Sequence, residues 1–238
     1  NLTGNPAYAN VGNFNGNARF DIGTGIVIAG SSVNVDLGAS GNNAGVIDAT
    51  TAGTLTVTGT NWTNSGTLRA SGGTLVTAGT WSSSSPGKLE LTAGTLNLGG
   101  TFNTASFRTL VRSNNAGSLN LTGTLNNTTG NGDDTLTLDA STGALQLVGG
   151  TIRSGSIVID NTAGGALRIG TATTGGTGFL ENVTLRAAPG AGNGVLSLSS
   201  GDDLRIRGAL TLDGGVIDLE ANSNYTYVRN ADNGVAAS

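Results

Sequence analysis

A short phrase that begins with glycine and then alternates apolar and polar residues recurs throughout this 238-residue chain. It reads "GKLELT" from Gly87 and "GALQLV" from Gly143. The other copies begin at Gly25, Gly45, Gly66, Gly117, Gly165, Gly194 and Gly215. Five of the eight intervals between successive copies are 20 to 22 residues long, and the three longer ones indicate insertions. A period of this length is typical of repeat proteins, in which each unit adds one small element to a stack.

Many units also contain a second strand-like phrase, such as "GTLTVTG" from Gly53 and "GTLVTAG" from Gly73. Alternation of period two, with β-branched residues inside the phrases and Gly, Asn or Ser between them, is typical of short strands and turns. No segment keeps the 3.6-residue period of a helix. Because so short a unit cannot bury its apolar side alone, the pattern predicts an all-β, parallel β-solenoid. Its coils hold roughly 20 residues with longer insertions, and helices are nearly absent.

Stacked coils place equivalent residues of successive units above one another, about 4.8 Å apart. The predicted aliphatic column consists of Leu55, Leu75 and Leu96. The predicted aromatic column consists of Trp62, Trp81 and Phe102, after an insertion of one residue in the first unit. A carbohydrate platform on the surface is the alternative interpretation of these aromatic residues. Their register with the leucines favours a stack inside the coil.

The amino-acid composition argues against several classes of protein function. Only 11% of the residues are charged and 4% are aromatic, but Val, Ile, Thr and Leu alternate throughout, which favours an ordered chain. A net charge of −4 argues against a nucleic-acid partner, because nothing would neutralise a row of phosphates. The chain has no Cys and no His, so thiol chemistry and the commonest general base are absent. No run approaches the roughly 20 apolar residues of a membrane span.

We predict a single β-solenoid over residues 1–238, with repeat coils over residues 25–220. The segments 1–24 and 221–238 break the pattern, and such atypical ends cap solenoids or join them. Since the chain begins at Asn1, we expect a processed product or an excised segment, and a preceding secretion signal is compatible with either.

The phrase "NYTYV" over residues 224–228 is a strand-like segment outside the repeat. Its residues Tyr225, Tyr227 and Val228 are candidates for assembly, because such a strand can add to the open coil of a neighbour. A local cap folded onto the last coil of the same chain is the alternative, and the sequence leaves both open.

The sequences of the repeats resemble the filamentous-haemagglutinin and autotransporter-adhesin type of repeat, which large secreted bacterial surface proteins contain. The resemblance lies in "NSGTLRASGGTLVTAGTW", "KLELTAGTLNLGGTF", "SLNLTGTLNNT" and "LQLVGGTIRSGSIV", and covers roughly residues 45–219. It implies a right-handed parallel β-helix on the outside of a bacterium. Such repeats carry over a fold far better than a function.

One acidic stretch, "TGNGDDTLTL" over residues 129–138, is similar to a single calcium-binding nonapeptide of the repeats-in-toxin kind. Gly130, Gly132 and Asp134 match that pattern, whereas Thr129 stands where the first glycine is expected. No second copy follows, although that family binds calcium between copies. Asp133 and Asp134 are therefore weak candidates for a calcium site, and a turn in which they bond their own backbone is favoured. No other cofactor is predicted.

An enzyme is a further hypothesis, because parallel β-helices also host pectate lyases and polygalacturonases. Glycoside hydrolysis needs two carboxyl groups that face each other across a sugar. Besides the acidic stretch above, only Asp202 and Asp203 form a pair, and we expect Arg205 and Arg207 to be their surface partners. Neither pair lies in a recognisable catalytic motif, and Lys88, the only lysine, lies in an ordinary repeat phrase. The sequence therefore predicts no catalytic residues and no enzyme.

The leading hypothesis is a non-enzymatic structural module or subunit of an extracellular bacterial fibre, sheath or surface adhesin. Its expected partner is itself, either as a head-to-tail homopolymer or as the continuation of a longer chain. A glycan-binding adhesin module, in which Tyr225 and Tyr227 contact a polysaccharide, is the alternative. A polysaccharide-degrading enzyme comes third.

Overall fold

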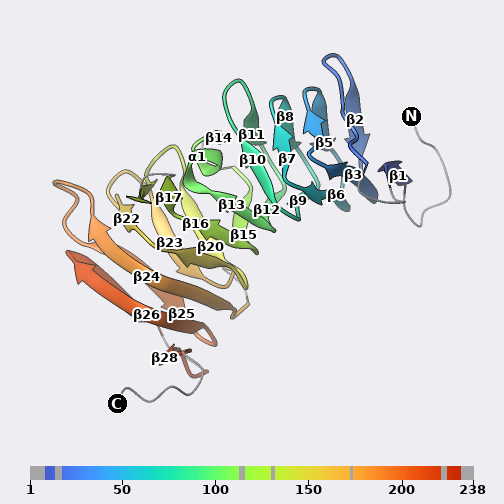
Figure 1. Ribbon diagram of the computed structural model, residues 1–238. Coiled ribbons are helices and arrows are strands. Elements are labelled where there is room, and N and C mark those ends of the chain that lie inside the picture. The colour runs from blue at the N-terminus through green and yellow to red at the C-terminus, as the bar shows by residue number, and fades with distance from the viewer. Residues whose placement is uncertain are drawn as a thin grey trace. The chain divides into compact units, whose positions relative to one another are not determined.

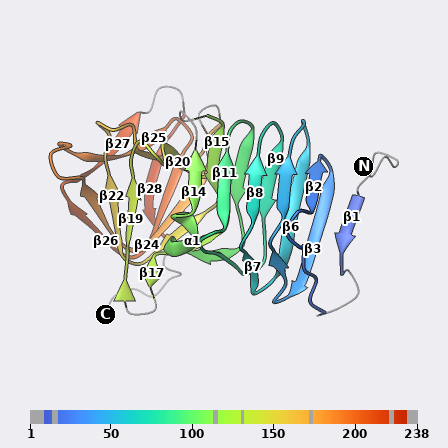
Figure 2. The same cartoon turned by 90° about the horizontal axis from the view of Figure 1, so that it is seen from above.

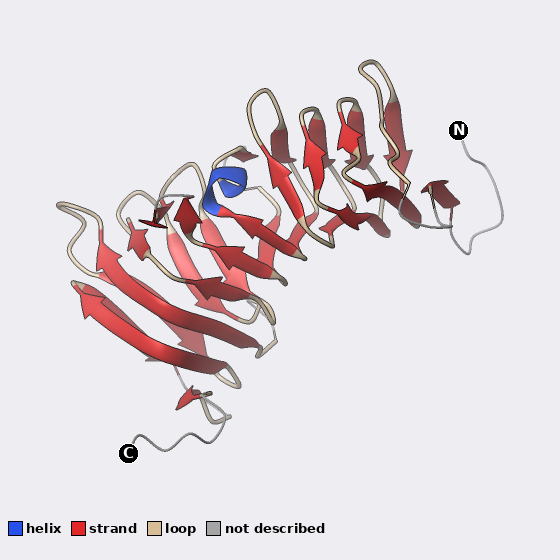
Figure 3. Cartoon of the chain, in the orientation of Figure 1, coloured by secondary structure: helices blue, strands red, loops and turns tan. Residues whose placement is uncertain are grey.

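The computed structural model describes residues 9–13, 18–112, 116–129, 132–171, 174–220 and 224–231, without the side chains of 129, 132 and 133. The protein is almost entirely β, with parallel sheets stacked as a β-solenoid of about nine turns and with about 2% helix (Figure 3), which confirms the predicted fold class. The handedness stays a prediction. The chain divides into two compact units, unit 1 over Asn1–Gly123 and unit 2 over Thr124–Ser238 (Figure 1).

Unit 1 contains three parallel sheets, whose strands lie side by side (Figure 2). Sheet 1a has the order β1 (Ala9–Gly12), β3 (Val33–Ala39), β6 (Thr54–Thr60), β9 (Thr74–Thr77), β12 (Thr95–Leu98) and β15 (Ser118–Leu121). Sheet 1b has the order β4 (Asn42–Asn43), β7 (Trp62–Asn64) and β10 (Trp81–Ser83). Sheet 1c has the order β2 (Val27–Gly30), β5 (Val46–Ala49), β8 (Thr67–Ala70), β11 (Lys88–Leu91) and β14 (Leu110–Arg112). The strand β13 (Thr101–Asn103) leads into the one-turn helix α1 (Thr104–Phe107).

The columns of unit 1 follow from the period-two alternation, which turns every second side chain of a strand inward. Leu75 lies opposite Leu55 on one side and Leu96 on the other, and all three are fully buried. Trp81 lies opposite Trp62, with ring centroids 5.6 Å apart. Phe102 stacks on Trp81 at 4.5 Å. The aliphatic and aromatic columns therefore run through the interior of this unit.

Two buried asparagines form a polar column at a corner of unit 1. The Asn43 amide donates to Oδ1 of Asn64 over 2.8 Å, and the Asn64 amide donates to Oγ of Ser83 over 3.1 Å. Asn43 and Asn64 are 0% and 1% exposed. Because each buried amide finds partners on a neighbouring coil, the column satisfies groups that would otherwise destabilise the interior.

Unit 2 contains two main sheets. Sheet 2a has the order β20 (Ala144–Leu147), β23 (Ala166–Ile169), β25 (Gly194–Ser199) and β27 (Gly215–Glu220). Sheet 2b has the order β16 (Thr124–Asn126), β21 (Thr151–Arg153), β24 (Thr177–Ala187), β22 (Ser156–Ile159) and β19 (Thr135–Leu138). The strand β26 (Asp203–Asp213) also pairs with β24, and β28 (Tyr227–Asn230) pairs with β26. A small antiparallel pair joins β17 (Thr128–Thr129) to β18 (Gly132–Asp133).

In unit 2, a long strand runs without a break through a position where the preceding coil turns a corner between two shorter strands. One coil supplies two separate strands, β21 and β22, and the single 11-residue strand β24 of the next coil pairs with both. The pairing of β24 with β26 shifts register between Glu181 and Val183. Asn182, at that shift, has a φ of +52°, in the left-handed region that asparagine tolerates better than most residues. Two long strands, β24 and β26, therefore lie side by side in unit 2.

Candidate functional site

The C-terminal end of unit 2 consists of the last coil, with β26 and β27, and of β28, which begins a further turn on β26. In the part of the chain that the structure describes, β27 ends sheet 2a and β28 lies outermost beside β26. The pairing of β28 with β26 is parallel, with Val228 opposite Leu204 and Tyr227 opposite Asp203. The predicted assembly residues Tyr227 and Val228 thus lie on the last coil of their own chain, and the outer edge of their strand has no described partner strand.

Three apolar residues at this end of unit 2 continue buried columns but are themselves exposed. The pairs are Leu219 on Leu198, Leu212 on Leu185 and Val228 on Leu204. The three inner leucines are fully buried, whereas the outer residues are 54%, 48% and 41% exposed. Because residues that pair in register point to the same face of a sheet, the outer three occupy interior positions of a coil that nothing described covers. We name Leu212, Leu219 and Val228 the open end.

The aromatic residues of the C-terminal segment lie at the surface. Tyr225 is 81% exposed and Tyr227 is 44% exposed. Their ring centroids are 6.2 Å apart, with the planes tilted by 38°. The guanidinium of Arg229 lies 4.2 Å from the ring centroid of Tyr227, which is a cation–π distance. The predicted assembly residues Tyr225 and Tyr227 therefore form one exposed pair beside an arginine.

Asp203 on β26 forms ion pairs with Arg205 on the same strand and with Arg229 on β28. Nε of Arg205 donates to one carboxylate oxygen over 2.8 Å, and Nε of Arg229 donates to the other over 2.7 Å. The carboxylate side chain is 11% exposed, whereas the two arginine side chains are 42% and 50% exposed. Two charge-assisted hydrogen bonds on a mostly buried carboxylate hold the terminal strand more firmly than an exposed ion pair does.

Arg207 differs from its neighbour Arg205. Its guanidinium lies 4.4 Å from the ring centroid of Phe179, and that of Arg205 lies 5.6 Å from the same ring. Over the ranges that the structure describes, Arg207 forms no ion pair with a carboxylate. Glu181, which lies opposite Arg207 in register, pairs instead with Arg153 over 3.0 Å. The expectation that Arg207 is a surface partner of the acid pair is therefore wrong, whereas Arg205 is one.

The other acid of the pair, Asp202, is buried, and its carboxylate is bound by backbone N–H groups. Its two carboxylate oxygens accept hydrogen bonds from the backbone N–H of Gly176 over 2.9 Å and of Ser199 over 2.6 Å. The residue is 1% exposed. Burial raises the pKa of Asp202, although these two hydrogen bonds act in the opposite direction. The two carboxylates thus bind different groups, one the backbone and the other two arginines.

The pH dependence of stability is expected to differ in sign between these two acids. Burial alone would raise the pKa of Asp203, but the hydrogen bonds from Arg205 and Arg229 outweigh it and hold this pKa below its ordinary value. The contribution of Asp203 is therefore complete above the unfolded-state pKa and is lost as the pH falls through the folded-state pKa.

Chemical denaturation measures this difference. Asp203→Asn should cost stability at about pH 6, and the cost should shrink well below the ordinary Asp pKa of 3.8. Asp202→Asn is the opposite-sign control, because the raised pKa of Asp202 makes the wild type gain relative to this variant as the pH falls. A cost of Asp203→Asn that does not change with pH would contradict the assignment.

The structure describes the side chain of only one of the two predicted calcium residues, Asp134. The Asp133 side chain lies outside the described residues. Oδ1 of Asp134 accepts a hydrogen bond from the backbone N–H of Thr135 over 2.7 Å, as in the turn that the sequence favours. Within the described ranges, no group of three or more acidic, histidine or cysteine side chains is placed to hold a metal ion. Within the same ranges, no helix has the length and apolarity that crossing a membrane requires.

The sequence did not reveal the partnership of Arg229 with Asp203. These residues lie 26 positions apart, and Arg229 belongs to the irregular segment, where no repeat predicts a register. The buried asparagines did leave a signal, because Asn43 and Asn64 each lie two residues before the glycine that starts a repeat phrase.

In comparisons with known proteins, no protein-family model, no curated protein and no solved structure matches the chain.

Proposed function

We propose that this protein is a non-enzymatic structural β-solenoid, a module or subunit of an extracellular bacterial fibre, sheath or surface adhesin that assembles end to end. The open end is the observation that carries this proposal. Leu212, Leu219 and Val228 stand where the coils beneath them hold fully buried leucines, yet each is about half exposed. Adding one more coil would remove this apolar surface from water, which stabilises by about 25 cal/mol per Å².

A second copy of this chain offers the strands that such an addition needs. In unit 1, β1 lies at one edge of sheet 1a and β2 lies at one edge of sheet 1c, and both sheets are parallel. An exposed edge strand presents unpaired N–H and C=O groups, and a strand from another molecule can bond to them. The β1 edge of one copy is therefore a parallel partner for the β27 edge of another, and head-to-tail repetition of this contact gives an open filament.

The mechanical role follows from the same stacking. Backbone hydrogen bonds run from coil to coil, and the aliphatic, aromatic and asparagine columns cross-link successive coils without a disulfide. Such a stack resists bending because each coil is bonded to both neighbours along the axis. These features support a structural role more directly than a catalytic one.

Electron microscopy and sedimentation velocity of the purified chain test the proposal. Wild type is expected to form filaments whose length grows with protein concentration. The double variant Leu212→Lys with Leu219→Lys should form few or none, because each ammonium group would have to be buried at the joint. Thr211→Lys is the matched control, since Thr211 is exposed and alternates with Leu212 on the same strand.

The control variant should polymerise like the wild type, and circular dichroism should give the same β spectrum for all three proteins. Filaments of normal length from the double variant would contradict joining through the open end. A wild-type chain that stays monomeric at every concentration would contradict end-to-end assembly itself.

A further inference from the structure

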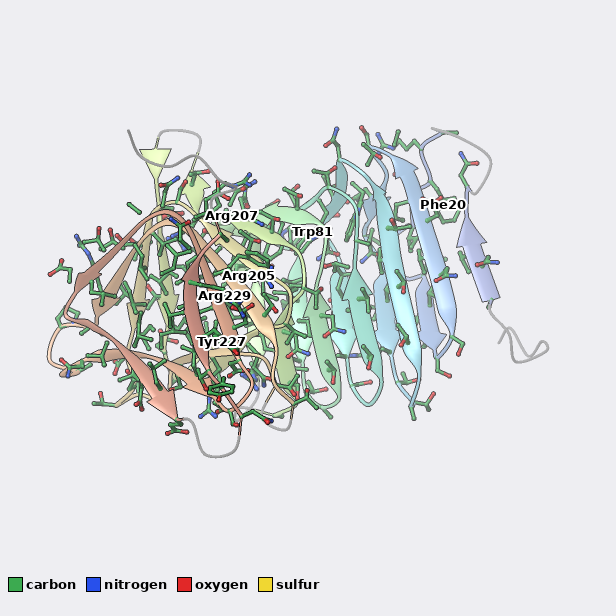
Figure 4. The ribbon with its side chains drawn as sticks, turned by 90° about the horizontal axis from the view of Figure 1, so that it is seen from below. Phe20, Trp81, Arg205, Arg207, Tyr227 and Arg229 are labelled. Atoms are coloured by element: carbon green, nitrogen blue, oxygen red, sulfur yellow. The ribbon has the colours of Figure 1, made fainter. Side chains whose placement is uncertain are left out.

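One outward face of unit 2 gathers cationic and aromatic side chains in register. Arg205 on β26 lies opposite Phe179 on β24 and opposite Arg229 on β28. Arg207 and Tyr227 lie two residues along from Arg205 and Arg229, which puts them on the same face of their strands. Figure 4 shows Arg207, Arg205, Arg229 and Tyr227 following one another along this face. We name it the arginine face, and its residues are Phe179, Arg205, Arg207, Tyr227 and Arg229.

The charge of the arginine face is opposite to that of the whole chain. Two of its three guanidinium groups bind one carboxylate, that of Asp203, and the third lies over the Phe179 ring, whereas the chain carries a net charge of −4. Both arginines that bind Asp203 reach it through Nε and keep about half of their side chains exposed. Arg207 carries a charge that no described carboxylate neutralises. The face therefore has positive charge left over for an anionic ligand.

The positions of these groups are fixed before a ligand arrives. Arg205 and Arg229 are held by Asp203, and Arg207 is held over the Phe179 ring. Arg229 also lies over Tyr227, whose ring is 44% exposed. Side chains that are already ordered lose less conformational entropy on binding, so they bind more tightly than free ones. The strands set the arginines of neighbouring coils about 4.8 Å apart.

We infer that the arginine face binds an extended polysaccharide whose sugar rings carry carboxylates, a polyuronate. The planar guanidinium fork matches a carboxylate with two parallel hydrogen bonds. The exposed tyrosine ring beside the arginines offers an apolar surface with a polar tip, which suits the face of a sugar ring. Two arginines along β26 and a third on the neighbouring strand β28 suit a ligand with one anionic group per repeating sugar. The site shares β28 with the open end, but Tyr227 and Arg229 point to the opposite face of that strand from Val228, so ligand binding is not expected to depend on end-to-end assembly.

Nucleic acid is the less favoured polyanion. Duplex DNA carries one charge per about 1.7 Å of axis, and proteins that bind it neutralise many phosphates. Three arginines in a chain of net negative charge supply too few cations for such a ligand. A polyuronate has a lower charge density, so a few well-placed guanidinium groups contribute a larger share of its binding free energy.

Isothermal titration calorimetry, which measures the affinity of the full chain for an oligogalacturonate, tests the inference. The matched ligand control is the methyl-esterified form of the same oligosaccharide, which has the sugar rings but no carboxylates. The wild type should bind the acid form and not the ester. Arg207→Gln should weaken binding roughly tenfold to a hundredfold, as expected for the loss of a charge-assisted hydrogen bond. Arg168→Gln is the matched protein control, because it removes the same charge from an exposed position on β23 of the same unit.

Arg207→Lys separates carboxylate recognition from general attraction between charges, because lysine keeps the charge and loses the planar fork. This variant should bind several-fold more weakly than wild type. Equal binding of dextran sulfate or single-stranded DNA, together with a lysine variant as tight as wild type, would show charge attraction alone and overturn the inference. No binding of the acid form by wild type would also overturn it. Filament formation is measured on the same samples, so loss of ligand binding is distinguishable from failure of the assembly proposal.

Discussion

Replacing Trp81 by alanine is expected to lower the free energy of unfolding by about 3–5 kcal/mol. The ring of Trp81 is sandwiched between those of Trp62 and Phe102, at centroid distances of 5.6 and 4.5 Å. The residue is 4% exposed, so alanine leaves a cavity that a backbone bonded to both neighbouring coils cannot collapse to fill. Its Nε1 also donates to the carbonyl oxygen of Gly99 over 2.9 Å, and the variant leaves that buried acceptor without this donor.

Urea denaturation of wild type and variants measures this loss. Trp81→Phe should cost much less, because phenylalanine keeps a ring in the column and gives up mainly the hydrogen bond to Gly99. Tyr225→Ala is the control for removing an aromatic side chain at the surface. Tyr225 is 81% exposed, and this variant should change the free energy of unfolding by no more than about 0.5 kcal/mol. A similar loss for Trp81→Ala and Tyr225→Ala would contradict a buried aromatic stack.

The regular coils could be predicted because their residues repeat. Period-two phrases separated by about one coil length place Leu55, Leu75 and Leu96 at equivalent positions, and a parallel stack has only one register that keeps every such leucine inside. The long strands of unit 2 could not be predicted in this way. The insertions there change the coil length, and the 11-residue strand β24 replaces the corner that the preceding coil makes between β21 and β22.

The candidate functional site was predicted less completely than the fold. The sequence indicated that Tyr225, Tyr227 and Val228 form a strand-like phrase, but not the partner strand. Only the structure shows β28 on β26, which brings Arg229 to Asp203. Sequence reasoning is weakest where long-range contacts are not repeated, because each such contact depends on one register that no second copy supports.

Gly79→Ala is expected to destabilise unit 1 by about 2–5 kcal/mol, which is more than a glycine-to-alanine change costs in most places. Gly79 has a φ of +74°, where a side chain costs about 1–2 kcal/mol. The added Cβ would also collide with the carbonyl oxygen of Gly59 on the preceding coil. That oxygen belongs to a backbone which is fixed in the stack, so the strain of overpacking adds to the cost of the conformation.

The same close approach to the preceding coil recurs on the following coils, which makes the glycines a column. A Cβ on Gly100 would meet the carbonyl oxygen of Gly79, and one on Gly123 would meet that of Gly100. Gly25→Ala separates the two causes, because Gly25 has a φ of +82° and nothing within 4 Å of the added Cβ. It should cost only about 1–2 kcal/mol in the same denaturation experiment. If both variants lost the same amount, the close approach of coils would contribute nothing, and the glycines of the repeat would be required for backbone conformation alone.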